Sequence, residues 1–94
     1  MAEYLVRIVL RRPDNVDDNS WAEILDDERQ VGMNYRRRGV LRRTWRVPGT
    51  TANVGLWSAS DASALHTLLS GLPAFPYMTI QVEALALHYL EAAG

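Results

Sequence analysis

Hydrophobic and polar positions alternate in two different ways in the first half of the chain. Over residues 2–11 apolar side chains recur at every second position, as in a strand with one better-buried face, and Pro13 ends the run. Over residues 17–39 they recur at every third or fourth position, as on one face of a long helix. The strand face comprises Tyr4, Val6, Ile8 and Leu10, and the helix stripe comprises Trp21, Ile24, Leu25, Val31 and Tyr35.

The ends of the long helix carry their own signals. Several N-cap residues lie in positions 17–20, and Ser20 and Glu23 have the spacing of a capping box. Gly39 is suited to the left-handed residue that follows a helix. The pattern therefore predicts a helix of about five turns.

Glu28 interrupts the apolar stripe of this helix. The neighbouring acids Asp26 and Asp27 fall on the sides or on the solvent face, so only Glu28 takes a position that packing alone would give to an apolar residue. Carboxylates on helices are most often solvated, and a carboxylate in such a place is otherwise a candidate for proton transfer. Both interpretations apply to Glu28 at this point.

The second half of the chain predicts a hairpin, a helix and a last strand. Residues 40–47 and 51–58 resemble strands, and the Pro48-Gly49 pair between them suits the centre of a type II turn. Ser60 or Asp61 caps a second helix that runs to Leu69, and residues 77–88 alternate as a fourth strand. The order βαββαβ predicts a single α+β domain over residues 1–94, with the ferredoxin-like antiparallel sheet and both helices on one face.

Pairing across the predicted turn would divide the hairpin into a polar and an apolar face. In the simplest register the polar pairs are Arg46 with Thr51, Thr44 with Asn53 and Arg42 with Gly55. Such a row is either a solvated sheet face or a surface that grips a carboxylate. The apolar face is expected to lie under the helices and comprises Leu41, Trp45, Val47, Ala52, Val54 and Leu56. Glu28 and the polar row would then lie on opposite sides of the sheet, unless a bulge after Gly49 or a pocket shared between subunits joins them.

Composition narrows the function classes. A formal charge of −1 gives no reason to expect a nucleic-acid or anionic-membrane partner, and the absence of cysteine excludes thiol chemistry.

The N-terminal run, broken by Arg7, predicts a strand and not a signal peptide, and no apolar run has membrane-spanning length, so a cytoplasmic location is expected. The third predicted strand has one aromatic residue, Trp57 at its far end, and lacks the glycine-aromatic signature of RNA-recognition domains, so RNA binding is not expected. His66 and His88, the only two histidines, lack ligand spacing, so a metal site is not expected.

Three stretches carry a family resemblance that extends over nearly the whole chain. They are Gly-Val-Leu-Arg-Arg-Thr-Trp-Arg-Val-Pro-Gly-Thr-Thr-Ala-Asn at residues 39–53, Ala-Leu-His at 64–66, and the more specific Leu-Pro-Ala-Phe-Pro-Tyr-Met at 72–78. Together they resemble the muconolactone delta-isomerase family. The resemblance implies a closed homo-oligomer, dimer-based and decameric in the best-known members. It also implies a cofactor-free enzyme that moves a double bond within an unsaturated lactone in aromatic catabolism.

The resemblance assigns two residues directly. Glu28 matches the acidic residue of the family and Asn53 the asparagine that follows the hairpin turn. A departure occurs at Thr50-Thr51, where the family carries a His-Tyr pair, so a related substrate becomes an option. The full set of candidate site residues is Glu28 as the base, Asn53, Thr51 and Arg46 as donors to the substrate, and Trp45 and Tyr77 as pocket walls or, alternatively, core residues.

Three functions remain open from the sequence. The first is an isomerase in which Glu28 moves a proton on a small substrate that bears a carbonyl or carboxylate group. The second is a cofactor-free cyclase or monooxygenase that tailors polyketides on the same architecture, since a fold hosts many chemistries. The third is a non-catalytic homologue that binds a small molecule.

Overall fold

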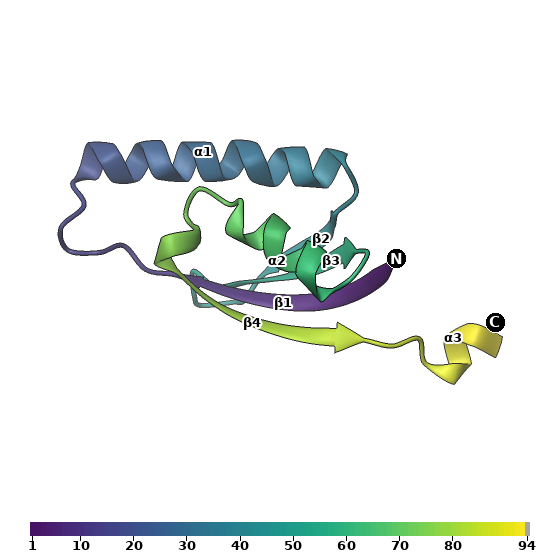
Figure 1. Cartoon of the computed structure of the whole chain (residues 1–94). Helices are drawn as coiled ribbons and strands as arrows, with labels where there is room; N and C mark the ends of the chain where they lie inside the picture. The colour runs from purple at the N-terminus through teal and green to yellow at the C-terminus, as the bar shows by residue number, and fades with distance from the viewer. Residues whose placement is uncertain (94) are drawn as a thin grey trace.

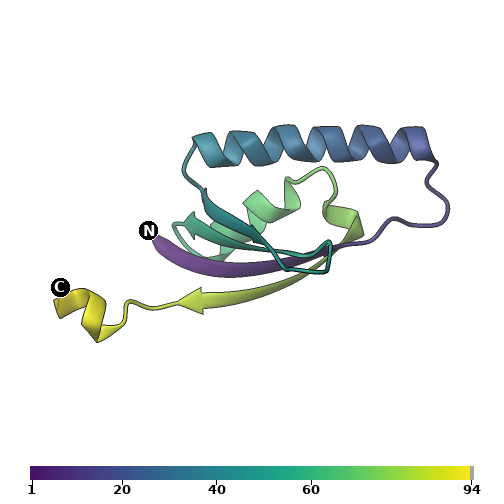
Figure 2. The same ribbon diagram turned by 180° about the vertical axis from the view of Figure 1, so that it is seen from behind.

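A four-stranded antiparallel sheet with strand order β2-β3-β1-β4 forms the centre of the computed structural model, which describes residues 1–93 and the side chains of residues 1–91. Helices α1 and α2 both lie on one face of the sheet, as Figure 1 and the reverse view in Figure 2 show. This arrangement confirms the predicted ferredoxin-like fold. The elements are β1 (Ala2–Leu10), α1 (Asp18–Arg37), β2 (Leu41–Arg46), β3 (Asn53–Ala59), α2 (Ala62–Ser70), the 3₁₀ helix η1 (Phe75–Tyr77), β4 (Met78–Leu85) and α3 (Tyr89–Ala93).

Both long helices begin at an aspartate. Asp17 caps α1 by accepting a hydrogen bond from the Ser20 N–H at 2.7 Å, so the N-cap lies three residues before the predicted capping-box serine. Asp61 caps α2 in the same way, accepting from the Ala64 N–H at 2.8 Å. Gly39 has φ +77°, as predicted for the residue that follows α1.

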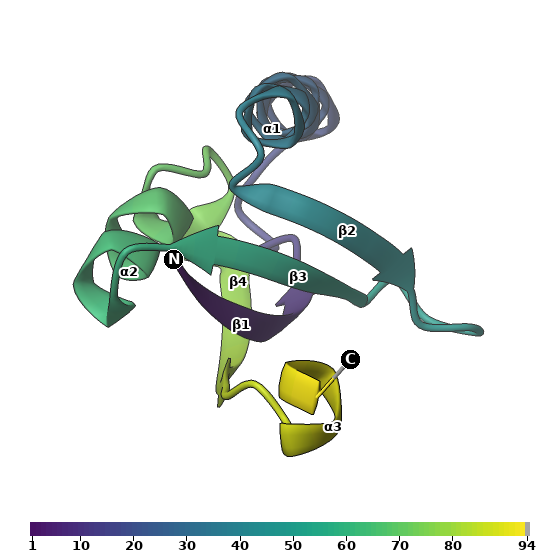
Figure 3. The same cartoon turned by 90° about the vertical axis from the view of Figure 1, so that its right-hand side faces the viewer.

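The core lies between the sheet and the helices. The predicted inner face of β1 is confirmed, because Tyr4, Val6 and Ile8 are buried. From the helices, Tyr35 of α1 and Leu65 and Leu69 of α2 complete the same cluster. Figure 3 looks along the sheet and shows α1 above β2, with α2 beside β3. Tyr35, near the end of α1, is its only buried residue, so the first turns of this helix do not seal against the sheet.

The hairpin between β2 and β3 differs from its prediction in both register and face. Arg46 pairs with Asn53 and Thr44 with Gly55, which is two positions away from the simplest register. The turn itself is as predicted, because the Thr50 N–H donates to the Val47 carbonyl at 3.1 Å and Gly49 has φ +78°. Strand β2 ends one residue earlier and β3 begins two residues later than predicted, and the shift of two positions in the pairing keeps Thr44, Arg46, Asn53 and Gly55 together on one face.

The predicted apolar face was wrong because β3 pairs with β1 so that Asn53 and Gly55 lie opposite the buried Ile8 and Val6, which leaves Val54 and Leu56 on the open face. Within β2, a β-bulge at Arg42 changes the side on which the residues before it lie. Leu41 pairs with Trp57 and Arg43 with Leu56, so β2 has one more residue than β3 between these two pairs. The extra residue inverts the alternation. Leu41 therefore lies under the helices, whereas Trp45 falls on the open face of the sheet and is 45% exposed. The polar row of the hairpin, not the apolar one, faces α1.

The C-terminal segment stands away from the body of the protein. After β4 the chain runs outward to the short helix α3, which Figure 1 shows far from the two long helices. The radius of gyration is 14.7 Å, whereas about 12 Å is expected for a compact chain of this length. The described side chains of this segment are exposed. We call residues 86–93 the C-terminal arm; α3 within it was not predicted, and β4 ends three residues before the predicted strand.

Candidate active site

A cavity of about 480 Å³ lies between the first turns of α1 and the inner face of the sheet. Its volume falls within the range of about 300–1,000 Å³ that is typical of small-molecule sites. Apolar side chains form most of the wall, and a small group of polar side chains reaches into it. The polar lining consists of Arg12, Glu28, Thr44, Arg46, Thr51 and Asn53.

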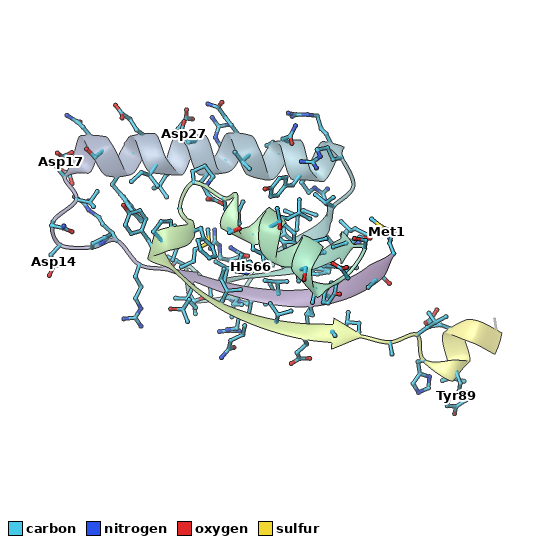
Figure 4. The ribbon with its side chains drawn as sticks, in the orientation of Figure 1. Met1, Asp14, Asp17, Asp27, His66 and Tyr89 are labelled. Atoms are coloured by element: carbon cyan, nitrogen blue, oxygen red, sulfur yellow. The ribbon has the colours of Figure 1, made fainter. Side chains whose placement is uncertain are left out.

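Glu28 is held against the cavity by a contact with a distant loop. Its Oε1 accepts the backbone N–H of Ala74 at 2.9 Å, across 46 residues of sequence, and Ala74 itself is fully buried. Asp27, the preceding residue, points away from the sheet into solvent (Figure 4). The helical spacing therefore placed Glu28 correctly, and the Leu72-to-Met78 string supplies the loop that fixes it.

Burial raises the pKa of the Glu28 carboxyl above its ordinary value of 4.5, and the Ala74 N–H opposes this shift. No arginine or histidine forms a salt bridge with Glu28 among the residues that the structure describes. Half-burial without a cationic partner makes this carboxylate a stronger base than a solvated one.

The hairpin supplies the donors opposite Glu28. Arg46 and Asn53 face each other across β2 and β3, and Thr51 follows from the loop. The Arg46 Nη1 donates to the Thr51 carbonyl and, at 3.4 Å, to the Ala52 carbonyl, which fixes the guanidinium beside the loop. The apparent separation of Glu28 from these donors therefore disappears, because the polar face of the hairpin is the inner face.

Thr50 and Thr51, the two positions at which the sequence departs from the family pattern, have different surroundings. Thr50 closes the hairpin turn: its hydroxyl donates to the Val47 carbonyl at 2.9 Å and accepts the Ala52 N–H at 3.0 Å. Thr51 lines the cavity, whereas Thr50 does not. Only one of the two substitutions therefore alters the cavity wall.

Arg12 marks the mouth of the cavity on the side of the loop before α1. Its guanidinium donates twice to the Val16 carbonyl, at 3.1 and 2.9 Å, and lies 2.7 Å from the Asp18 carboxylate. These contacts hold the loop in a defined shape. Arg12 was not among the predicted site residues, because nothing in the spacing of residues 11–17 connects it to Glu28.

Two tryptophans line the cavity, but they are not the aromatic residues that the sequence suggested. Trp21 and Trp57 face the cavity, whereas Trp45 lies on the opposite face of the sheet. Tyr77 belongs to η1 and packs edge-on against Trp21, with ring centroids 5.6 Å apart, behind the cavity wall. Trp57 had a detectable signal, because it shares the alternation of Asn53 and Gly55 along β3.

Neither histidine belongs to the cavity. His66 is exposed on α2 and packs edge-on near Phe75, with centroids 6.3 Å apart, and His88 lies in the C-terminal arm. Within residues 1–93 no three acidic or histidine side chains come together as a metal site would require. No helix in this part of the chain is both long and apolar enough to cross a bilayer.

The arrangement joins a carboxylate of raised pKa, a guanidinium and neutral polar groups in one largely apolar cavity. Such a set can remove a proton from carbon while the donors hold the oxygen atoms of an anionic or carbonyl-bearing molecule. A family model described as muconolactone delta-isomerase matches residues 2–91.

Several curated proteins and solved structures are similar to this chain. Muconolactone Delta-isomerase 2 of Acinetobacter lwoffii is 34% identical over 83 residues, which cover 88% of this chain and 86% of that protein. Muconolactone Delta-isomerase of Cupriavidus pinatubonensis is 36% identical over 85 residues, or 90% and 92% of the two chains. The crystal structure of muconolactone isomerase superposes with a TM-score of 0.85 at 31% identity, covering 92% of this chain and 90% of that one. The chain therefore belongs to the muconolactone delta-isomerase family of intramolecular isomerases.

Proposed function

We propose that this protein isomerises muconolactone or a close analogue without a cofactor, in the catabolism of aromatic compounds, with Glu28 as the proton-transfer group. The observation that carries the proposal is the half-buried Glu28 carboxylate in the same cavity as Arg46 and Asn53. The names of the relatives support the choice of substrate. Muconolactone is an unsaturated five-membered lactone with a carboxymethyl side chain, so it presents a carboxylate, a carbonyl oxygen and an acidic C–H bond.

The reaction is a proton shift that needs no oxidant. Glu28 takes the proton from the ring carbon that bears the side chain, and the electrons of that C–H bond form a new ring double bond. The original double-bond electrons move toward the carbonyl oxygen, which gives a dienolate. Glu28 then returns the proton to the carbon next to the carbonyl, so the double bond has moved by one position and every atom is retained.

The hairpin residues hold the substrate carboxylate in this scheme. Arg46 carries the only positive charge that the hairpin brings to the cavity, and a guanidinium pairs well with a carboxylate. The amide of Asn53 and the hydroxyl of Thr51 lie beside it and add directional hydrogen bonds. With the carboxylate at the hairpin, the lactone ring extends into the apolar part of the cavity below α1.

Incubation with muconolactone in heavy water tests the proposal. The product should carry deuterium at the carbon next to the carbonyl, as followed by proton NMR and mass spectrometry. No oxygen should be consumed, in contrast to what a monooxygenase would require. Absence of both the double-bond shift and the exchange, with muconolactone and with its methyl-substituted analogues, would refute the isomerase.

The pH dependence of kcat/KM follows from the raised pKa of Glu28. Only the carboxylate form accepts a proton, so kcat/KM should fall as the pH drops through the pKa of Glu28. Because burial raises that pKa, the fall should be centred above the ordinary value of 4.5. A pH–rate profile between pH 4 and 9 measures its position. An acidic limb at or below pH 4.5 would show that another group is the base.

We also propose that the chain assembles into a homo-oligomer, built from dimers and decameric if it follows the resemblance. The face of the sheet opposite the helices supports this. Apolar Leu5, Val54 and Leu56 lie there side by side without a helix to cover them, and Trp45 continues the patch. Arg7 and Arg43 on this face are complemented by Glu3 and Glu83, so a second copy offers both apolar and oppositely charged partners.

The C-terminal arm is a second surface that a neighbouring copy would cover. Leu87, Tyr89 and Leu90 are 73%, 72% and 63% exposed, and such a run of apolar side chains is unfavourable in water. A Leu87→Asp, Leu90→Asp variant should therefore shift the molar mass in solution toward the monomer, as measured by light scattering after size exclusion. Met33→Asp, on the exposed side of α1, is the matched control and should leave the mass unchanged. A monomeric wild type would refute the assembly.

A further inference from the structure

Trp57 has an indole ring whose orientation is fixed from behind. The residue is 3% exposed, and the ring of Tyr35 meets it edge-on, with centroids 5.7 Å apart and planes at 75°. The Tyr35 hydroxyl in turn donates to the Leu68 carbonyl at 2.7 Å. Gly71 leaves room for that hydroxyl, because a Cβ at this position would lie 2.9 Å from it. The ring of Trp57 therefore cannot rotate freely.

The indole N–H of Trp57 lies over Gly55 on the inner face of β3. A Cβ on Gly55 would lie only 2.8 Å from Nε1 of Trp57 and 3.1 Å from Cδ1 of Leu41. Real Cβ atoms do not approach a neighbour this closely, so the position needs glycine for the sake of the indole. Gly55 pairs with Thr44, which lines the cavity, so the N–H group lies along the cavity floor.

No acceptor takes this N–H among the described residues, although a buried indole N–H normally has one. In this part of the chain every fully enclosed side-chain nitrogen and oxygen has a partner. The unpaired Nε1 must therefore touch open space, and the open space that Trp57 contacts is the cavity. A nearly buried donor without a protein partner that faces a cavity indicates a ligand atom that accepts from it.

We propose that the Trp57 indole N–H donates a hydrogen bond to the lactone carbonyl oxygen of the substrate, where negative charge develops as Glu28 removes the proton. This inference rests on the proposed function and adds a residue to it. Asn53 and Gly55 are two residues apart on one face of β3, or about 7 Å. That separation lets Arg46 and Asn53 hold the carboxylate at one end while Trp57 holds the carbonyl at the other.

The carboxylate and carbonyl ends of the substrate differ in charge, and the two kinds of donor in the cavity match this difference. A permanent carboxylate is best matched by the permanent charge of Arg46. A carbonyl oxygen gains charge only in the transition state, and a fixed neutral donor placed there stabilises the dienolate more than the bound substrate. Trp57 is therefore expected to affect kcat more than KM.

Replacement of Trp57 by Phe keeps an apolar ring against Tyr35 and removes the N–H. We expect kcat to fall about tenfold or more, as for the loss of one hydrogen bond made mainly in the transition state, with KM changed by less than about threefold. Trp45→Phe, on the open face, is the matched control and should keep kcat. Unchanged kcat in a folded Trp57→Phe protein would overturn the inference.

NMR of the indole N–H groups distinguishes a hydrogen bond from Trp57 to the ligand from a purely structural role of this residue. The chain has three tryptophans, so a ¹⁵N-labelled sample shows three indole N–H signals, and the Trp57→Phe spectrum identifies the one that belongs to Trp57. The saturated analogue of muconolactone, which has no double bond to move, should shift the Trp57 proton downfield and leave the Trp45 proton in place. γ-Valerolactone, which lacks the carboxylate, should shift the same signal at millimolar concentration, whereas butyrate should not.

The outcomes distinguish this inference from the proposed function. Turnover of muconolactone together with an unmoved Trp57 signal would overturn the role of Trp57 and leave the isomerase intact. A shifted Trp57 signal in a wild type without turnover would overturn the isomerase, and with it the role of Trp57 in catalysis. Repeating the titration on Glu28→Gln, which should bind without turnover, shows whether the contact forms before the proton moves.

Discussion

Replacement of Glu28 by Gln is expected to lower kcat for muconolactone isomerisation by about 10²–10⁴-fold, the range that general base catalysis supplies. Glutamine keeps the side-chain length, and its amide oxygen can still accept the Ala74 N–H that Glu28 accepts at 2.9 Å. The cavity therefore keeps its shape and loses only the group that takes a proton. Steady-state kinetics and the incorporation of deuterium from heavy water should decline together.

Two comparisons make the result of Glu28→Gln interpretable. Glu23→Gln changes an exposed carboxylate of the same helix and should leave kcat within about twofold of the wild type. The pH dependence of the folding stability provides the second comparison. The folded state binds a proton at Glu28 more tightly than the unfolded state, so wild-type stability falls as the pH rises from 4.5 through the raised pKa. The Gln variant should lack this fall in a thermal unfolding series, and a variant that keeps full turnover would remove Glu28 from the mechanism.

Replacement of Arg46 by Met is expected to lower kcat/KM by about 10- to 150-fold, because a hydrogen bond to a charged group contributes about 1.5–3 kcal/mol. Methionine keeps much of the apolar stem and removes the charge that pairs with the substrate carboxylate. KM should rise more than kcat falls, because the carboxylate is equally charged in the substrate and in the transition state. Kinetics at several ionic strengths measure both parameters.

Arg43→Met is the matched control for Arg46. Arg43 lies on the same strand but on the open face, with its guanidinium 5.3 Å from the centre of the Trp45 ring. Its loss should leave KM unchanged. Arg46 also donates to the Thr51 and Ala52 carbonyls, so a thermal unfolding curve of each variant is needed to separate substrate binding from support of the loop. An equal rise of KM in both variants would contradict a specific carboxylate contact.

The main helices and strands were predictable because each local sequence pattern fits only one kind of secondary structure. Alternation over residues 2–11 with Pro13 after it leaves little choice but a strand, and the stripe from Trp21 to Tyr35 little choice but a helix. Pro48-Gly49 fixed the turn. The helix of the arm after β4 was missed because it has only five residues and follows His88, which is not a usual N-cap residue, although its ring accepts the Leu90 N–H at 3.1 Å.

The candidate site was predictable only where a residue broke its own pattern. Glu28 stands in an apolar stripe, and this single irregularity pointed to the carboxylate that lines the cavity. Trp57 and Arg12 break no pattern, and their place in the cavity depends on how distant segments come together. Trp45, in contrast, lay beside the candidate donors in sequence and is on the other face of the sheet in space.

The sequence by itself determined the six main elements (β1, α1, β2, β3, α2 and β4), their order and the place of Glu28 within the apolar stripe of α1, because helical and strand periodicities are properties of neighbouring residues. It did not determine which face of the hairpin meets the helices. Strand alternation has a period of two, so it divides the residues of a strand between two faces without showing which face meets the helices. Only the tertiary structure decides this: β3 pairs with β1 so that Asn53 lies opposite the buried Ile8, and Arg46, which pairs with Asn53, therefore lies on the same side of the sheet as Glu28.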